Sequence, residues 1–299
     1  AQENVTKLCE AQEELARAAG KPKRSYELIV AKPELLEIGY EIAGDRIEDA
    51  IYADSKVERQ KKVGALRDEV EAAIKERHPE ATDFDVEQVF EYIQKKAFRI
   101  SIMEKNKRAA GRELKQLRPL TAEINCLPSV VHGSDDVLEH GKERFLLHYN
   151  FPPFSVGDTG RFGGQSRREI GHGALAERSI APVIPADADF PYAIRVSSEV
   201  MESNGSTSMA TVCAGTMSLL AAGVPLIRPV AGISVGLVTE FNGDQMERYV
   251  TLLDIIGSED FYGDMDFKLC GTDAGVTGYQ LDLKLPGIPL DILEEAIYV

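Results

Sequence analysis

A short segment near the end of the chain combines three carboxylates with one ammonium group. Asp260, Asp264, Asp266 and Lys268 lie within nine residues, on a stretch that reads as a turn entering a β-strand. Because side chains alternate along a strand, Asp266 and Lys268 project from one face, and Asp264 joins them unless the turn diverts it. Carboxylates this close repel one another unless a positive charge neutralises them. Oxygen ligands suit hard cations, so we predict a Mg²⁺ or Mn²⁺ site, with a solvated acidic turn as the alternative.

A second segment could hold an anion. Gly205 is followed by three hydroxyl residues, Ser206, Thr207 and Ser208, which open a helical stretch of small residues that ends near Gly223. The first N–H groups of a helix lack backbone partners and carry partial positive charge, so this end of a helix can bind phosphate. One hydroxyl suffices for a helix cap, so plain capping is the alternative. A cation site and an anion site together indicate phosphoryl chemistry.

Arg167, Arg168 and His172 form a third candidate group. Guanidinium groups contact phosphate through paired hydrogen bonds, so the two arginines fit a phosphate-rich ligand. The alternative is a solvated basic turn beside a structural histidine. We find no convincing Ser/His/Asp or Cys/His arrangement, which fits phosphoryl transfer without a nucleophilic side chain.

The elements that must position these groups fall into two zones. In the first zone we predict four helices, over residues 4–19, 33–52, 55–77 and 83–104, of which the first is amphipathic and the last has the apolar spacing of a core helix. Pro33 suits the first turn of its helix, and Asp83 or Asp85 could cap the last one. A basic connector, Lys105 to Arg118, follows; we interpret it as a linker, with RNA contact as the alternative.

From residue 144 onward the pattern changes to strands. Clean alternation predicts strands over residues 192–196 and 278–285, and two further strands are expected over 228–239 and 247–255, on either side of the loop at 242–244. A helix over 206–223 and a terminal helix over 290–297 complete this zone. The sequence therefore predicts an all-helical N-terminal domain followed by an α+β domain.

Composition sets the outer bounds. The 299 residues can hold one large domain and a smaller one. The four cysteines are scattered without a C-x-x-C pair, which argues against a disulfide framework or a zinc site. No apolar run reaches membrane-spanning length, and the polar start is unlike a signal peptide, so we expect a cytoplasmic protein without membrane contact.

Four segments carry a specific resemblance, at residues 145–155 (FLLHYNFPPFS), 167–173 (RREIGHG), 202–210 (ESNGSTSMA) and 263–268 (GDMDFK). In order and spacing they resemble the second RNase PH-type domain of the polynucleotide phosphorylase family. The resemblance implies three parts. Residues 1–31 would end a preceding RNase PH-type domain, 32–104 would form an all-helical linker domain, and 105–299 would form an RNase PH-like α+β domain of the ribosomal-protein-fold type.

The resemblance also implies an activity. Members of the family are 3′→5′ exoribonucleases in which inorganic phosphate attacks the 3′-terminal phosphodiester of single-stranded RNA. Nucleoside diphosphates are released, and the reaction is reversible. The resemblance further implies Mg²⁺ as cofactor, with Mn²⁺ as the alternative, a homotrimer, and partners in an RNA degradosome.

The family's site residues can be carried over position by position. Those matched to catalysis are Asp260, Asp266 and Lys268, of which the two aspartates are metal ligands. Those matched to phosphate binding are Ser206, Thr207 and Ser208, with threonine in the middle of a serine run. Those matched to RNA binding are Arg167, Arg168 and His172.

Three features depart from the family pattern. The net charge of −15 is unfavourable for RNA binding, so positive charge must be local or RNA capture must belong to other modules. The segment Arg108-Ala109-Ala110-Gly111-Arg112 carries alanine where the family normally has aspartate. Between 134 and 144 the chain is too short for the family's strand, turn and strand, so we expect this strand pair to be missing, which would expose sheet edges.

Two alternative functions follow from these departures. The first is a non-catalytic ring or scaffold subunit of an RNA-degrading assembly. The intact Asp260, Asp266, Lys268 and hydroxyl run argue against it. The second is a tRNA-trimming RNase PH-like enzyme, against which the helical domain argues.

Overall fold

The computed structural model describes residues 2–26, 29–53, 55–109, 111–118, 144–161, 163–243 and 245–299. The expected gap in the sheet between 134 and 144, Cys126 and Ala110 lie outside these residues. None of the helices in the described part of the chain is long and apolar enough to cross a bilayer.

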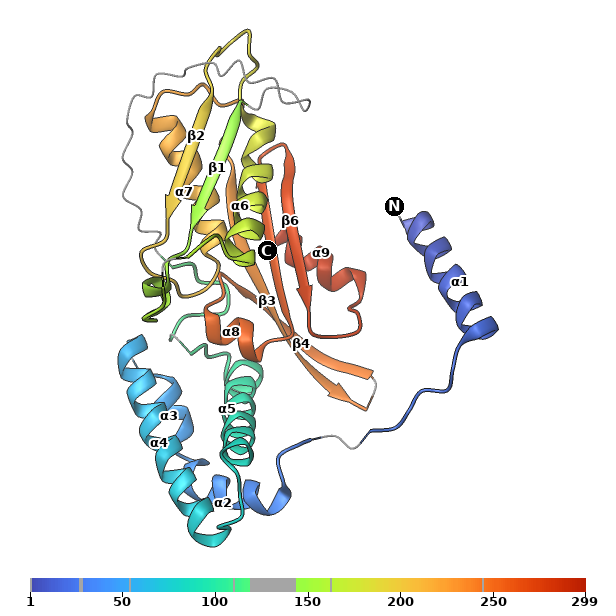
Figure 1. Ribbon diagram of the computed structural model, residues 1–299, viewed down its shortest axis with the longest axis vertical. Helices are drawn as coiled ribbons and strands as arrows, with labels where there is room; N and C mark the ends of the chain where they lie inside the picture. The colour runs from blue at the N-terminus through green and yellow to red at the C-terminus, as the bar shows by residue number, and fades with distance from the viewer. Residues whose placement is uncertain are drawn as a thin grey trace.

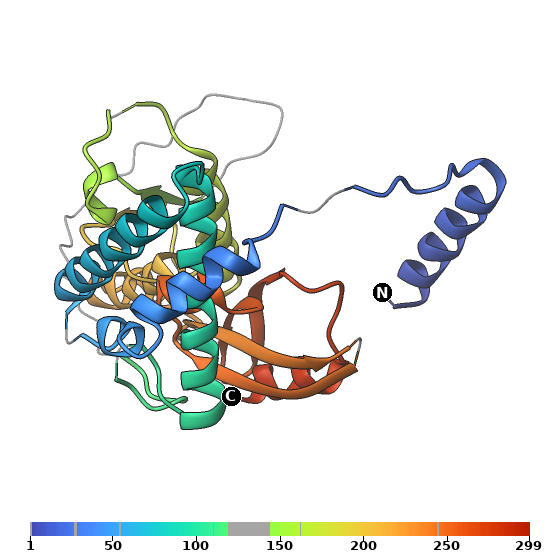
Figure 2. The same ribbon diagram turned by 90° about the horizontal axis from the view of Figure 1, so that it is seen from below.

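The helical region consists of α2 (Pro33–Ala43), α3 (Ile47–Ile51), α4 (Lys56–Arg77) and α5 (Asp83–Lys105). Their apolar faces meet in one core, and this core continues into the sheet through Val238, Leu252 and Ile255. The helical region is therefore packed against the sheet. In contrast, α1 (Gln2–Ala19) has no buried residue and stands away from the rest in both views (Figures 1 and 2).

The predicted helices are confirmed with two differences. The helix expected over 33–52 is interrupted at Gly44, because glycine is a poor helix former and the following Asp45 favours turns. The cap of α5 is Thr82, not Asp83 or Asp85. Thr82 Oγ1 accepts from the Asp85 backbone N–H at 3.2 Å, and Asp85 Oδ2 accepts from the Thr82 N–H at 2.9 Å, which makes a capping box.

The second zone contains two sheets. Strands β1 (Phe145–Asn150) and β2 (Ile194–Glu199) pair in parallel. The other sheet is antiparallel, with strand order β4 (Gln245–Leu253), β3 (Ala231–Asn242), β5 (Met265–Thr272) and β6 (Gly275–Leu283). The four predicted strands are confirmed, with ends shifted by a few residues.

Helices α6 (Arg167–Ile180) and α7 (Thr207–Ala221) contact both sheets and so form a layer between them (Figure 1). Helix α9 (Leu290–Tyr298) packs on the opposite face of the four-stranded sheet, where Val235, Leu237 and Phe267 meet Ile292. Cys270, on the other face of β5, packs with Met209 of α7. By strand alternation, Asp266 and Lys268 share the α7-facing side with Cys270.

Two helices of the described chain were not among the predictions. Helix α8 (Gly257–Tyr262) carries Asp260, and α6 begins at Arg167. The paired arginines therefore occupy the first turn of a helix, and the interpretation of a basic turn is wrong. The pattern Ser166-x-x-Glu169 is a capping-box signature that could have revealed α6, since Ser166 Oγ accepts from Glu169 N–H at 3.2 Å.

Candidate functional site

Asp266 and Lys268 lie side by side on β5. Lys268 Nζ is 3.0 Å from Asp266 Oδ2, and both residues are buried, at 6% and 9% exposure for the lysine and the aspartate. Burial raises the pKa of the Asp266 carboxyl, and the Lys268 charge opposes that shift. The predicted common face is confirmed, and one oxygen of the Asp266 carboxylate, Oδ1, is buried without a hydrogen-bond partner among the described residues.

Two further carboxylates surround Asp266. The negative charges of Asp260 on α8 and Asp282 on β6 also contribute to its raised pKa, after burial. Asp282 lies directly opposite Asp266 in the register of β5 and β6. The sequence interpretation missed Asp282, although its place in the alternating 278–285 segment was a usable signal. Across the described ranges, no set of three or more His, Cys, Asp and Glu side chains is arranged to hold a metal ion.

Asp264 serves a different purpose from its neighbours. Arg99 Nη1 lies 2.9 Å from Asp264 Oδ1, and Arg99 Nη2 lies 2.9 Å from Asp264 Oδ2. The Thr239 N–H and hydroxyl both donate to Asp264 Oδ2. Burial alone would raise the pKa of Asp264, but the hydrogen bonds from Arg99 and Thr239 lower it. The charge that neutralises Asp264 is therefore an arginine of α5, so Asp264 does not belong to the predicted cation site.

The hydroxyl run (Ser206, Thr207 and Ser208) lies at the start of α7. Ser206 occupies the N-cap position, but its side chain makes no capping hydrogen bond, so plain capping by this hydroxyl is wrong. Its Oγ lies 3.5 Å from Ser208 Oγ. Thr207 Oγ1 lies 2.6 Å from the Tyr149 hydroxyl on β1. The middle residue is thus held in place by β1, while the two serines flank it at the N-terminal end of the helix.

His172 of α6 also contacts the Tyr149 hydroxyl. Its Nδ1 lies 3.5 Å from the Tyr149 hydroxyl, and the two rings meet edge to face with centroids 5.6 Å apart. Burial, together with the positive charges of Lys268 and Arg168, lowers the pKa of His172 to about 4. The imidazole is therefore neutral at pH 7, and Lys268 of β5 is close enough to influence it.

Arg167 and Arg168 are exposed on the first turn of α6. The Arg168 guanidinium stacks over the Phe151 ring, 4.3 Å from its centroid. Positive side chains at a helix N-terminus oppose the helix dipole, so helix stability does not account for this pair.

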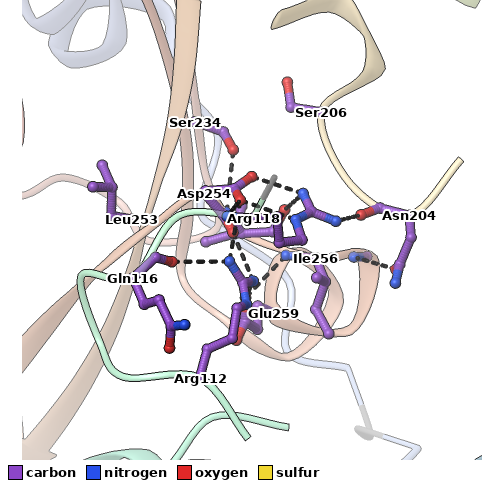
Figure 3. A network of polar contacts seen from close by, with 12 residues as sticks. Arg112, Gln116, Arg118, Asn204, Ser206, Ser234, Leu253, Asp254, Ile256 and Glu259 are labelled. Carbon is purple, nitrogen blue, oxygen red and sulfur yellow. Dashed lines mark hydrogen bonds and ion pairs between the residues drawn. The ribbon is translucent and has the colours of Figure 1, made fainter. Parts of the chain in front are cut away.

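A polar network joins the connector to α8 (Figure 3). Arg118 donates to Asp254 from Nε at 2.9 Å and from Nη2 at 2.7 Å, and Arg112 lies 3.1 Å from the same carboxylate. Arg108 and Glu259 form a fully buried ion pair, with the Arg108 Nε–Glu259 Oε1 distance at 2.7 Å. The interpretation of the connector as a linker is therefore incomplete, because its arginines are structural parts of the domain.

Two family models match the chain. Residues 34–113 match the model described as "Polyribonucleotide nucleotidyltransferase, RNA binding domain". Residues 120–225 match the RNase PH model, described as "3' exoribonuclease family, domain 1". Together they confirm the predicted order of a helical region followed by an RNase PH-like α+β domain.

Two curated relatives agree with these models. The polyribonucleotide nucleotidyltransferase of Akkermansia muciniphila is 77% identical over 327 residues, which cover 100% of this chain and 46% of that protein. The corresponding protein of Methylacidiphilum infernorum is 49% identical over 325 residues, again 100% of this chain and 46% of its own length. The crystal structure of rice Rrp46 has a TM-score of 0.46 at 17% identity, over 64% of this chain and 91% of that one.

The chain spans about half the length of the curated relatives it matches. High identity extends along the whole of this chain, and the two family models follow one another in the expected order. The chain belongs to the polyribonucleotide nucleotidyltransferase family, whose members are also called polynucleotide phosphorylases.

Proposed function

We propose that this chain is the phosphorolytic part of a 3′→5′ exoribonuclease. Inorganic phosphate attacks the 3′-terminal phosphodiester of single-stranded RNA, a nucleoside diphosphate leaves, and the reaction is reversible. The observation that carries the proposal is the meeting of the buried Asp266–Lys268 pair with His172 and the hydroxyl run. These groups offer an anionic and a cationic subsite where β5 and α6 meet α7, and phosphoryl transfer requires both.

Asp260 and Asp266 are the proposed ligands of a divalent cation, Mg²⁺ or Mn²⁺. Membership of the family suggests a divalent metal, and the unpartnered Oδ1 of Asp266 is an oxygen of the type such ions prefer. A bound divalent cation would neutralise charge on the scissile phosphate and on the departing 3′-oxygen. Lys268 holds the Asp266 carboxylate in one orientation through its 3.0 Å contact. It also adds a positive charge beside the reacting phosphate.

The attacking phosphate is proposed to bind at the N-terminal end of α7. Ser206 and Ser208 supply hydroxyl donors, and the unpaired N–H groups of the first turn add partial positive charge. The Tyr149 hydrogen bond fixes the Thr207 hydroxyl and, through it, the start of the helix. The neutral imidazole of His172 can donate one hydrogen bond without adding charge.

RNA is proposed to reach this site along the exposed arginines of α6. Arg167 and Arg168 oppose the dipole of their own helix, a cost that contact with phosphate groups would offset. Their local charge answers the difficulty of the overall charge of −15. Phe151 beneath Arg168 keeps that guanidinium extended at the surface.

The remaining assignments are part of the same proposal. We propose three domains, over residues 1–31, 32–104 and 105–299. We also propose that the protein forms a homotrimer, binds RNA-degradosome partners and acts in the cytoplasm.

The match to the Akkermansia muciniphila relative runs over 327 residues, 28 more than the 299 of this chain. That difference agrees in size with a missing strand pair between 134 and 144.

The decisive experiment is to follow poly(A) degradation by the full-length protein with and without inorganic phosphate. Release of ADP that requires phosphate, and that carries ³²P when labelled phosphate is used, is the expected result. Phosphate-independent release of AMP would indicate hydrolysis, and no release in either condition would favour the non-catalytic scaffold. Preference for a precursor tRNA over poly(A) would favour the tRNA-trimming alternative.

A further inference from the structure

One arginine, Arg118, binds the loop that precedes the hydroxyl run. This Asn204 loop (Asn204 and Gly205) leads into Ser206 and α7, and the Arg118 guanidinium lies beside Asn204 (Figure 3). Arg118 Nη1 donates to the Asn204 carbonyl oxygen, while Nε and Nη2 donate to the two oxygens of Asp254 at 2.9 and 2.7 Å. One guanidinium therefore bridges the Asn204 loop and the segment that leads into α8.

The contact between the loop and this segment is close. Gly205 has φ +119°, and a Cβ at this position would lie 2.3 Å from the Ile255 carbonyl oxygen and 2.9 Å from Arg118 Nη2. No side chain fits between these groups, so the loop backbone rests directly on Ile255 and Arg118.

A second link runs from the loop to α8 itself. The Asn204 side-chain oxygen accepts a hydrogen bond from the Gly257 N–H at 3.4 Å, at the first residue of α8. Three residues further along, α8 carries Asp260. The Asn204 loop therefore connects the proposed phosphate site to the helix that bears a proposed metal ligand.

Asp254 is itself held in an unusual conformation. Its φ of +55° lies in the left-handed region, which non-glycine residues seldom adopt. Its N–H donates to the Ser234 carbonyl at 2.7 Å, and its carboxylate also accepts from the Arg118 N–H at 2.8 Å. Strained backbone persists where surrounding contacts over-determine it, and such positions concentrate at functional sites.

We propose that Arg118 is a positioning residue for phosphate binding. By bridging Asp254 and the Asn204 carbonyl, it sets the distance between the hydroxyl run and Asp260. This inference rests on the proposed function, because it assigns a binding role to the hydroxyl run. Loss of the bridge should weaken the interaction with inorganic phosphate and leave the interaction with the RNA chain largely unchanged.

The test compares Arg118→Gln, which removes the bridge, with Arg118→Lys, which keeps a charge beside Asp254 but has no fork to reach both partners. The matched control is Arg248→Gln, which breaks an exposed arginine–carboxylate pair with Glu240 between β3 and β4. In the full-length protein, KM for phosphate and KM for poly(A) are measured separately. The rise in melting temperature caused by inorganic phosphate is measured as a binding readout independent of turnover.

We expect Arg118→Gln to raise KM for phosphate roughly tenfold, as loss of a charge-assisted hydrogen bond would, with KM for poly(A) within about twofold of wild type. Arg118→Lys should fall between the two, and Arg248→Gln should match wild type. The phosphate-induced rise in melting temperature should be smaller in Arg118→Gln than in wild type, and it should be unchanged in Arg248→Gln.

Equal phosphate KM values in Arg118→Gln and Arg248→Gln would overturn the positioning role and leave the proposed function standing. If the wild-type protein showed no phosphorolysis, the proposed function would be refuted. The positioning role would still be supported in that case if inorganic phosphate raised the melting temperature of the wild type but not of Arg118→Gln. If Arg118→Gln does not fold, Arg118→Lys decides, and a wild-type phosphate KM in that variant overturns the inference.

Discussion

Arg99 and Asp264 face each other across the boundary between the helical region and the four-stranded sheet, with both N–O distances of their two-pronged ion pair at 2.9 Å. Nearby, the Tyr262 hydroxyl donates to Gln94 of α5 at 2.9 Å, and the Tyr262 ring packs against Phe98. Helix α5 therefore braces both α8, which carries Asp260, and the start of β5, which carries Asp266. The helical region is a structural support of the candidate site.

Arg99→Gln should destabilise the protein by about 2–3 kcal/mol, because it leaves the nearly buried Asp264 carboxylate without its charged partner. The control is Arg46→Gln, which breaks an exposed two-pronged pair with Glu69. Exposed pairs contribute about 1 kcal/mol or less. Urea unfolding followed by circular dichroism measures both losses. Equal losses in the two variants would show that burial of Asp264 is unimportant.

The Arg108–Glu259 pair should show strong coupling, since both side chains are fully buried. Glu259→Gln or Arg108→Met alone should each cost about 3–5 kcal/mol, because either change leaves an uncompensated buried charge. The double variant should cost clearly less than the sum. A double-mutant cycle from chemical denaturation gives the coupling free energy. If the losses were additive, Arg108 and Glu259 would not be each other's main interaction partner.

The sequence predicted those parts of the fold whose signal is local. Apolar spacing identified the helices that became α1 and α5, and alternation identified β2 and β6. The sequence interpretation missed α6, although its Ser166-x-x-Glu169 capping box is a local signal, and it missed α8, which is only six residues long. The break after Ala43 was missed because the apolar pattern continues through Gly44 on both sides.

The candidate site shows the same division. Strand alternation correctly placed Asp266 beside Lys268, since period two is a property of any strand. Asp264 does not join Asp260 and Asp266 because it is paired with Arg99, which is 165 residues away in the chain. No local sequence pattern could have predicted such a distant partner. Tyr149 and Asp282 likewise reach the site only through packing and strand register.

Asp266→Asn should abolish phosphorolysis while the fold remains intact. The amide can still accept a hydrogen bond from Lys268, but the buried Lys268 ammonium loses its charged partner, so we expect a stability loss of about 2–3 kcal/mol. Loss of the carboxylate charge should lower ADP release from poly(A) roughly a hundredfold or more. The control is Asp273→Asn, which alters an exposed carboxylate paired with Arg228. Unchanged ADP release in Asp266→Asn would refute the site assignment.

His172 should make stability depend on pH. In the folded protein its pKa is lowered to about 4 from an ordinary value of 6.5, so between these values the unfolded chain binds a proton that the folded chain does not. Its stabilising contribution is full above pH 6.5 and is lost as the pH falls towards 4. His172→Gln should remove this contribution, so its melting temperature should fall less between pH 7 and pH 5.

The same prediction can be checked directly by NMR. The imidazole resonance absent from the spectrum of His172→Gln identifies His172, and its chemical shift should stay constant from pH 7 down to about pH 5. A titration midpoint near 6.5 would show that the side chain is neither desolvated nor close to the positive charges of Lys268 and Arg168.

Gly205→Ala should disturb the site far more than Gly223→Ala, although both glycines have positive φ, at +119° and +78°. A Cβ at Gly223 meets nothing within 4 Å, so only backbone strain is added there, about 1 kcal/mol. A Cβ at Gly205 would lie 2.3 Å from the Ile255 carbonyl oxygen, which forces the Asn204 loop away from α8.

We expect KM for phosphate to rise at least about tenfold in Gly205→Ala, because at least one well-placed hydrogen bond to phosphate would be lost. In Gly223→Ala, KM for phosphate should stay near the wild-type value. Steady-state phosphorolysis at saturating poly(A), with melting temperatures as the check on folding, separates the two effects. If both variants showed the same phosphate KM, backbone strain alone would explain the need for glycine, and close contact between the loop and Ile255 would have no bearing on binding.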